Sequence, residues 1–363
     1  MKVALVYDRV NKWGGAERVL LALHDLFPDA PLYTSVYDKK KASWAKVFTV
    51  NTSFLQNLPW ASSNHEYFPY LMPLAFEQFT FDEYDLVISV TSEAAKGIIT
   101  KPSTKHICYC LTPTRYLWSG YNHYFPNKFM KIAGYPVVSY LRKWDLIASQ
   151  RPDVFVTLSK EVQGRVKKYY GRNSELIYPP LTLNPRPFRQ LADRISDFQQ
   201  GDYFLIVSRF VQYKRIDLAI SVCNELGLPL KIVGSGREEK KLKAIAGPTI
   251  EFTGHVSDEK VVEYYKGCKA FLFPGLEDFG LTIIEAAYFG KPVIAFRGGG
   301  AAETIIECKT GYFFNKQTAE SLRETLKKIE TYTFDPKDCR EQAGKFSLKK
   351  FETNFLRLVN SVI

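Results

Sequence analysis

Short apolar runs that alternate with helical patterns constrain the fold of this chain more than any other feature. In the first half, residues 2–7 read KVALVY and residues 85–90 read DLVISV, with an amphipathic segment from Ala16 to Phe27 between them. Such runs, separated by longer helical segments, are typical of parallel strands joined by crossover helices. The pattern starts again at residues 203–208 (YFLIVS). The sequence therefore predicts an α/β fold with two Rossmann-like, parallel-sheet domains in series.

The polar segment 181–201 separates the two halves. It reads LTLNPRPFRQLADRISDFQQG, and its two prolines interrupt both helix and strand patterns. We expect an N-terminal domain over residues 1–185 and a C-terminal domain over residues 200–345. A final helix at about 346–363 is expected to pack back on the N-terminal domain.

Positive charge is concentrated in one part of the chain. The formal net charge is +11, and residues 96–189 alone hold 16 basic and 4 acidic residues, a net of +12. Many aromatic side chains, such as Tyr116 and Trp144, lie in the same stretch. This combination suits an anionic membrane surface or a phosphate-bearing partner, although a solvated basic face is the simpler alternative. No motif of a nucleic-acid-binding module is present, so we expect no nucleic acid partner.

The sequence carries no sign of export. The opening residues, MKVALVYDRV, contain a short apolar run that ends at Asp8, which is typical of a first strand and not of a signal peptide. No apolar run approaches the roughly 20 residues that span a bilayer. The six cysteines form no C-x-x-C pair. We therefore expect reduced thiols and a cytoplasmic location.

Residues directly after strands are the candidates for a site, because ligands of doubly wound sheets bind at the carboxyl ends of the strands. Residues 13–17 (WGGAE) join the first strand to the first helix. Gly14 and Gly15 would let the backbone approach a ligand, and the helix N-terminus would attract an anion. A plain tight turn explains the glycines equally well. The spacing is not G-x-G-x-x-G, which disfavours a dinucleotide.

Two basic residues follow the first strand of the second half. Arg209 ends that strand and Lys214 precedes the next helix. Two fixed cations can bind a diphosphate and can neutralise the charge that develops on it as it departs. A solvated turn is the alternative. Residues 234–236 (GSG) follow the next strand and could contact a base or ribose, although a tight connection accounts for them as well.

Two carboxylates stand out in residues 274–286 (PGLEDFGLTIIEA). Glu277 follows a strand, Asp278 can cap the next helix, and Gly280 lies at its start. Glu285 lies among apolar neighbours about one turn into the helix, where a carboxylate needs hydroxyl donors. Two such carboxylates could hold a sugar diphosphate, with the N–H groups at the helix start aimed at the same space. A glycosidase acid–nucleophile pair is the alternative, but it leaves Arg209 and Lys214 unexplained.

The E-x7-E spacing from Glu277 to Glu285 resembles family 4 glycosyltransferases of the GT-B fold. VSRFVQYKRIDLAI upstream and KPVIAFRGGGAAETI downstream extend this resemblance over nearly the whole chain. VYDRVNKWGGAERVL and CYCLTPTRYLW resemble bacterial mannosyltransferases of O-antigen and exopolysaccharide assembly. The resemblance implies retaining, metal-independent transfer of a hexose to a glycan or lipid-diphosphate-linked glycan. GDP-mannose is the favoured donor, a UDP-sugar is the alternative, and the two domains would face each other across a central cleft.

The resemblance also implies roles for individual residues, with the donor on the C-terminal domain and the acceptor on the N-terminal one. Arg209 and Lys214 match the pair that binds the donor pyrophosphate. Glu285 matches the carboxylate that binds ribose, and Glu277 matches the one that holds the hexose. The remaining donor-binding residues by resemblance are Gly14, Gly15, Asp278, Phe279, Gly280 and Leu281. The candidates for the acceptor side are Thr112, Thr114, Arg115 and Trp118.

One residue departs from the pattern of the family. Relatives often have a histidine near the donor sugar where this chain has Leu111, in CYCLTP. Leucine cannot bind a hydroxyl, so this branch lacks that contact, has weak activity, uses another donor sugar, or binds a nucleotide sugar without catalysis. His106 lies on the same predicted strand, five residues earlier. By resemblance the protein would work at the inner face of the cytoplasmic membrane as a peripheral protein.

Overall fold

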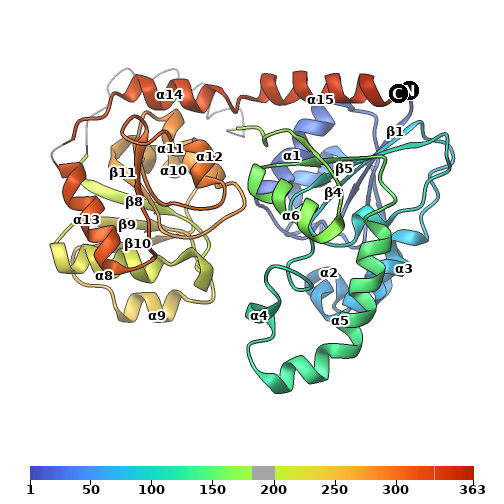
Figure 1. Ribbon diagram of the computed structural model, residues 1–363, viewed down its shortest axis with the longest axis horizontal. Coiled ribbons are helices and arrows are strands. Elements are labelled where there is room, and N and C mark those ends of the chain that lie inside the picture. Colours follow the sequence, from blue (N-terminus) through green and yellow to red (C-terminus); the bar gives the residue numbers. More distant parts are fainter. Residues whose placement is uncertain (182–200, 331) are drawn as a thin grey trace. The chain divides into compact units, whose positions relative to one another are not determined.

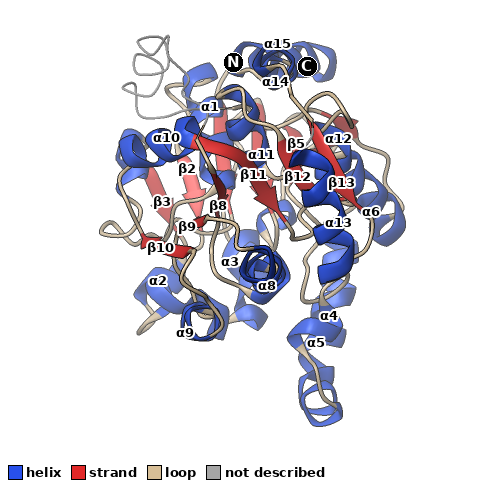
Figure 2. Ribbon diagram, turned by 90° about the vertical axis from the view of Figure 1, so that its left-hand side faces the viewer, coloured by secondary structure: helices blue, strands red, loops and turns tan. Residues whose placement is uncertain are grey.

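The computed structural model describes residues 1–181, 201–330 and 332–363, so most of the predicted linker 181–201 lies outside the described residues. The chain divides into two compact units (Figure 1). One comprises Met1–Pro180 with Phe351–Ile363, and the other comprises Leu181–Lys350. Each unit is built on one parallel sheet with helices around it (Figure 2). The prediction of two Rossmann-like α/β domains is confirmed.

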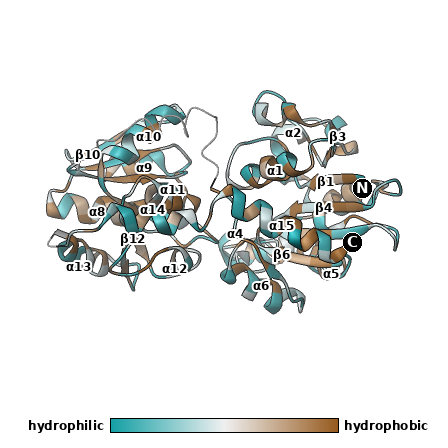
Figure 3. Cartoon of the chain, turned by 90° about the horizontal axis from the view of Figure 1, so that it is seen from above, coloured by the Kyte–Doolittle hydropathy of each residue, from teal (hydrophilic) through white to brown (hydrophobic). Residues whose placement is uncertain are grey.

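The sheet of the first unit has the strand order β3-β2-β1-β4-β5-β6-β7, and every neighbouring pair is parallel. The order reverses between β1 and β4, which are buried along their length and mostly apolar (Figure 3). Loops that follow these two strands therefore lie at a topological switch point. The strands are β1 (Val3–Tyr7), β2 (Leu32–Thr34), β3 (Val50–Thr52), β4 (Leu86–Thr91), β5 (Lys105–Cys110), β6 (Val154–Thr157) and β7 (Glu175–Leu176).

Helices of the first unit differ widely in length. The sequence predicts α6 (Lys160–Tyr170) correctly because both of its ends are marked. Ser159 accepts a hydrogen bond from the N–H of Val162 at 3.1 Å, and Gly171 ends the helix at a φ of 68°. The others are α1 (Gly15–Leu26), α2 (Ala61–Asn64), α3 (Met72–Glu77), α4 (Tyr121–Tyr124) and α5 (Lys128–Ala148), with 3₁₀ turns η1 (Ser43–Val47), η2 (Phe54–Asn57), η3 (His65–Tyr67), η4 (Pro69–Leu71) and η5 (Ala95–Gly97).

The sheet of the second unit has the strand order β10-β9-β8-β11-β12-β13, again all parallel, and reverses between β8 and β11. Its strands are β8 (Tyr203–Val207), β9 (Leu230–Val233), β10 (Ile250–Gly254), β11 (Cys268–Phe273), β12 (Val293–Phe296) and β13 (Gly311–Phe314). Its helices are η6 (Gln212–Lys214), α8 (Ile216–Leu226), α9 (Glu239–Ala244), α10 (Asp258–Gly267), α11 (Leu281–Tyr288), α12 (Ala301–Thr304), α13 (Ala319–Glu330) and α14 (Pro336–Gly344).

The last helix, α15 (Leu348–Val362), begins in the second unit and belongs to the first unit from Phe351 onward. A break in the chain separates it from the preceding helix, α14. At the break the carbonyl of Phe346 accepts a hydrogen bond from the N–H of Leu181 at 2.8 Å. Within the first unit, the ring of Phe351 packs edge-on against Tyr109 of β5, with centroids 6.2 Å apart.

Two histidines are buried in the first unit. His106 of β5 is fully buried, and its Nε2 lies 2.8 Å from the hydroxyl of Ser89 on β4. His65 is buried, with Nδ1 3.1 Å from the amide nitrogen of Asn11. Burial, reinforced by nearby arginines, lowers the pKa of His106 to about 3 and that of His65 to about 4. Both rings are therefore neutral in the folded protein at neutral pH.

These pKa shifts predict that the first unit loses stability as the pH falls. A histidine whose pKa is lowered by folding stabilises the fold fully above its unfolded pKa of about 6.5 and progressively less below it. Between pH 7 and pH 5 we expect each ring to cost up to about 2 kcal/mol of unfolding free energy. Thermal unfolding of the wild type and of His106→Asn across this range measures the effect. The stability of His106→Asn should depend less on pH than that of the wild type. His255→Asn is the control: His255 is exposed, so this variant should depend on pH as the wild type does. Equal slopes for all three proteins would contradict the assignment.

Candidate functional site

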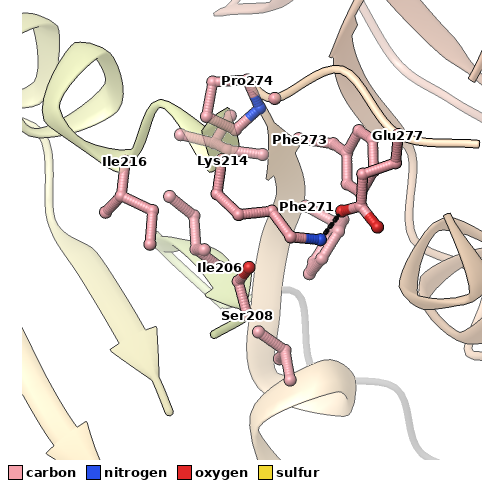
Figure 4. Close-up of a pocket in the computed structure, with 11 residues that line it drawn as sticks. Ile206, Ser208, Lys214, Ile216, Phe271, Phe273, Pro274 and Glu277 are labelled. Carbon is pink, nitrogen blue, oxygen red and sulfur yellow. Dashed lines mark ion pairs between the residues drawn. The ribbon is translucent and has the colours of Figure 1, made fainter. Parts of the chain in front are cut away.

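The strongest candidate site lies at the switch point of the second sheet, where the loops after β8 and β11 meet. The ammonium group of Lys214, at the end of η6, forms an ion pair with the carboxylate of Glu277, in the loop after β11 (Figure 4). The side chains are 12% and 22% exposed, so both groups are partly shielded and partly open to a ligand. A cation from one loop and a carboxylate from the other therefore meet in this unit.

A small pocket lies beside this ion pair (Figure 4). Its walls come from the carboxyl ends of the two central strands, including Ile206, Phe271 and Phe273. The ring centroid of Phe273 lies 5.9 Å from the Lys214 ammonium, close enough for a cation–π contact. The pocket thus combines an apolar wall with one cation and one carboxylate, as binding pockets for small molecules commonly do.

Arg209 lies in the same loop as Lys214 but points to a more exposed place. Its guanidinium donates to the hydroxyl of Tyr213 at 3.4 Å, and its side chain is exposed. Residues 234–236 pack directly on this loop, because a Cβ on Gly234 would overlap the carbonyl of Ser208 and one on Gly236 would overlap that of Phe210. Glycines 234 and 236 therefore make the tight connection that was one of the two sequence interpretations.

The loop 274–280 is held by close backbone contacts. The N–H of Gly300 donates to the carbonyl of Glu277 at 3.0 Å, and a Cβ at Gly300 would overlap the backbone of Phe279. A Cβ on Gly275 would lie 2.8 Å from Cα of Lys214. The downstream RGGGAAETI segment is glycine-rich because the Glu277 loop rests on it.

Helix α11 starts differently from the prediction for Asp278. The N-cap residue is Gly280, with a φ of 85°, and as a glycine it has no side chain with which to cap the helix. Only glycine adopts this left-handed conformation readily, so Gly280, not Asp278, makes the turn into the helix. Phe279 is buried and packs edge-on against Phe346 with ring centroids 5.5 Å apart, while Leu281 is the first helical residue.

Glu285 is held by a residue that the sequence patterns did not single out. The hydroxyl of Tyr265, on α10, donates to Oε2 of Glu285 at 2.7 Å, and both residues are buried. The Tyr265 ring stacks on Phe289 with centroids 5.5 Å apart, which fixes the direction of its hydroxyl. The need of Glu285 for a hydroxyl donor was predictable, but Tyr265 lies 20 residues earlier and only the packing of α10 on α11 brings the two together.

In the first unit, Gly14 and Gly15 lie at the start of α1. Gly14 is the N-cap residue in an extended conformation, and Gly15 is the first helical residue. A Cβ on Gly14 would lie 3.2 Å from a carboxylate oxygen of Glu17, which also accepts a hydrogen bond from Tyr7 at 2.7 Å. Burial raises the pKa of the Tyr7 phenol, and Glu17 raises it further.

The switch point of the first sheet is organised by Asp8, another residue that the motifs did not identify. Its fully buried carboxylate accepts hydrogen bonds from the hydroxyl of Thr91 at 2.9 Å and from the backbone N–H groups of residues 92–95 at 2.6–3.0 Å. Arg9 pairs with Glu93 at 3.1 Å beside it. Asp8 therefore fixes the loop after β4, and its oxygens are engaged within the fold.

Two of the acceptor-side candidates are bound to a buried carboxylate. Thr114 and Trp118 donate to Asp145 of α5 at 3.0 and 2.7 Å. Lys96 lies 2.5 Å from the same carboxylate, and both charged groups are 1% exposed. Burial opposes the charged form of Lys96, but Asp145 outweighs it and raises the lysine pKa.

The other two acceptor-side candidates are Thr112 and Arg115. The hydroxyl of Thr112 accepts a hydrogen bond from Arg165 at 3.4 Å and is buried, while Arg115 is half-buried. Leu111 is also half-buried, directly after β5, whereas His106 is enclosed at the other end of that strand. His106 therefore does not take the place of the histidine that Leu111 replaces.

Two further properties bear on the site. Within residues 1–181, 201–330 and 332–363, His, Cys, Asp and Glu side chains form no group of three or more that could hold a metal ion. Of the helices described, none combines the length and apolar character needed to cross a bilayer.

Comparison with known proteins finds similarity to glycosyltransferases. Residues 189–346 match the family model described as "Glycosyl transferases group 1". An uncharacterized glycosyltransferase of Methanocaldococcus jannaschii is 29% identical over 209 residues, which cover 56% of this chain and 57% of that protein. O-antigen chain mannosyltransferase C of Escherichia coli is 25% identical over 227 residues, 60% and 58% of the two chains. The matches thus span less than two thirds of these relatives.

Solved structures resemble the chain over its whole length. HepE of Anabaena in complex with UDP has a TM-score of 0.70 at 17% identity, covering 99% of this chain and 100% of that one. The lipopolysaccharide outer core galactosyltransferase WaaB has a TM-score of 0.67 at 17% identity, with both chains fully covered. These likenesses show that the chain has the GT-B fold.

The close contact at Gly300 predicts a specific sensitivity. Gly300→Ala should force the Glu277 loop to shift and should lower the unfolding free energy of the second unit by about 2 kcal/mol. Gly344→Ala is the matched control, since a Cβ there meets nothing within 4 Å, and it should change stability by about 0.5 kcal/mol or less. Urea unfolding of both variants makes the comparison. Equal effects at the two positions would show that the contact at Gly300 carries no strain.

Proposed function

We propose that the protein transfers a hexose from a nucleotide sugar to a glycan acceptor, since residues 189–346 match the family model of group 1 glycosyl transferases. The observation that carries the proposal is the ion pair of Lys214 with Glu277 at the switch point of the second sheet. A glycosidase needs two carboxylates across a scissile bond and has no use for a cation bonded to one of them.

The donor would be held by groups from three segments of the second unit. Lys214 and Arg209 bind the pyrophosphate, and Glu277 binds hydroxyls of the hexose. Glu285, oriented by Tyr265, binds the ribose hydroxyls with its remaining hydrogen-bonding capacity. The ion pair keeps Lys214 and Glu277 in place, so little conformational entropy is lost when each exchanges its partner for the donor.

The chemical step needs charge stabilisation at the departing diphosphate. Lys214 and Arg209 supply positive charge there, which is the electrostatic work that a metal ion performs in other transferases. The sugar would be transferred with retention of configuration, by attack on the face from which the diphosphate leaves. The donor phosphate would help to take the proton of the acceptor hydroxyl.

GDP-mannose is the donor that we favour. The sequence resemblance to O-antigen mannosyltransferases supports it, and a relative of that name is 25% identical. A UDP-sugar is the second candidate, because related folds are solved with UDP and with UDP-glucose. A thermal-shift screen of GDP-, UDP-, ADP- and dTDP-linked sugars discriminates between them, since a bound donor raises the melting temperature.

The acceptor would be a lipid-diphosphate-linked glycan, held by the first unit at the inner face of the cytoplasmic membrane. The net charge of +12 over residues 96–189 supports an anionic surface as partner. A nucleotide-sugar-binding protein without catalysis is the alternative, and Leu111 is the residue that favours it. Calorimetry with donor nucleotides, combined with a transfer assay, separates the two: binding without turnover on any acceptor would support the alternative.

Substitutions at the donor site should affect transfer to different extents. Lys214→Ala should lower kcat by about 100-fold, because it removes positive charge from the departing diphosphate. Glu285→Ala should raise KM for the donor by about tenfold to 100-fold, and Tyr265→Phe by about fivefold, because ribose contacts are lost or misdirected. Transfer from a radiolabelled sugar nucleotide measures these changes.

The matched control is Lys241→Ala, since the Lys241 side chain is 78% exposed and pairs with Glu238, which is not a residue of the donor site. Its kinetic constants should equal those of the wild type. Wild-type rates in both Lys214→Ala and Glu285→Ala would overturn the assignment of the donor site.

A further inference from the structure

Helix α5 carries an apolar stripe on its outer face. Phe129 and Ile132 are 79% and 74% exposed, and Tyr140 and Ile147 are 52% and 62% exposed. Together with Pro136, these side chains recur at spacings of three, four or seven residues, so they lie on one side of the helix. An exposed apolar stripe in water is costly unless something covers it.

The opposite face of α5 already has its partners. Val138, Leu141, Asp145 and Ala148 are buried there. Val138 and Leu141 form a small core with Leu117. The outer stripe is therefore not a displaced part of the core. Figures 1 and 2 show that α4 and the first half of α5 extend away from the sheet of the first unit, which leaves the stripe accessible.

The charged side chains at the surface of α5 are all basic. Lys128, Lys131, Arg142 and Lys143 are its basic residues. Its only acidic residue, Asp145, is buried against Lys96. Lys143 lies between Tyr140 and Ile147 along the stripe, and Lys128 lies next to Phe129. A partner that binds this surface must therefore be apolar where it contacts the stripe and negatively charged beside it.

A bilayer that contains anionic lipids satisfies both requirements, and a second copy of the chain does not. In a two-fold dimer the same surface would meet itself, so two surfaces of the same positive charge would be brought together. An amphipathic helix with Lys on its flanks and Phe, Ile and Tyr on one face is typical of helices that lie in the membrane interface. With 21 residues the helix is about 30 Å long, but its lysines exclude a transmembrane orientation.

We propose that α5 lies in the plane of an anionic membrane, with Phe129, Ile132, Tyr140 and Ile147 inserted among the lipids and the lysines at the headgroups. This assigns a contact surface to the membrane partner of the proposed function and rests on that function only for its biological setting. Lipid binding is measured without a sugar donor, and nucleotide-sugar binding without lipid, so either can fail without the other.

The test is cosedimentation with vesicles of phosphatidylcholine, with and without phosphatidylglycerol. The wild type should bind the vesicles with phosphatidylglycerol, and less strongly at high salt. The double variant Ile132→Ser with Ile147→Ser should bind them about tenfold more weakly, because two partly inserted side chains lose their apolar transfer energy. The matched control is Ile245→Ser, since Ile245 is 48% exposed and lies in the second unit.

A second measurement does not depend on weakening the binding. Phe129→Trp should give a blue-shifted emission with these vesicles and quenching by brominated lipids, whereas Tyr67→Trp, at a site 72% exposed outside α5, should give neither. Wild-type vesicle binding by the double serine variant would overturn the proposal. So would sedimentation velocity that shows a wild-type dimer and a monomeric double variant, because the stripe would then be a self-association surface.

Discussion

The reversal of strand order in each sheet is the constraint on which both candidate sites depend. Where neighbouring strands send their connections to opposite sides, the loops at their carboxyl ends separate and leave room for polar groups. In the second unit this place holds Lys214 and Glu277 beside a pocket. In the first unit it holds Asp8 and the loop after β4. Sequence positions about 60 to 80 residues apart become neighbours for this reason alone.

The two switch points use their carboxylates differently. Asp8 accepts several backbone hydrogen bonds and is fully buried, so it serves as part of the frame of the first unit. Glu277 is paired with a single cation and stays partly exposed. A carboxylate saturated by backbone N–H groups cannot bind a substrate hydroxyl, whereas one paired with a movable lysine can. The carboxylate of Glu277 is thus accessible to a ligand, whereas that of Asp8 is not.

Much of this was accessible from the sequence, because it depends on local patterns. The runs that became β8 and β11, and the helix that became α6, have hydrophobic periodicity and marked ends. β2 and β3 were not predicted, since three residues are too few to establish a period. Helix α5 was not predicted, because Gly134 and Pro136 interrupt its helical pattern. Its exposed apolar residues were interpreted as part of an aromatic stretch.

Partners that come from distant segments could not be predicted. Glu285 needed a hydroxyl donor, but nothing in the spacing pointed to Tyr265 on another helix. The same holds for Asp8, whose partners lie more than 80 residues away. Asp278 was predicted to cap α11 because its residue type is common at N-caps. The N-cap residue is Gly280, whose left-handed backbone makes the turn into the helix.

The buried carboxylate of Asp145 gives α5 a consequence beyond its outer surface. The same helix that exposes Phe129 and Ile132 holds Thr114 and Trp118 from its inner side, just after Leu111. One helix therefore carries both the surface proposed to contact lipid and the carboxylate that positions the segment 112–118. A shift of α5 is expected to move Thr114 and Trp118 with it.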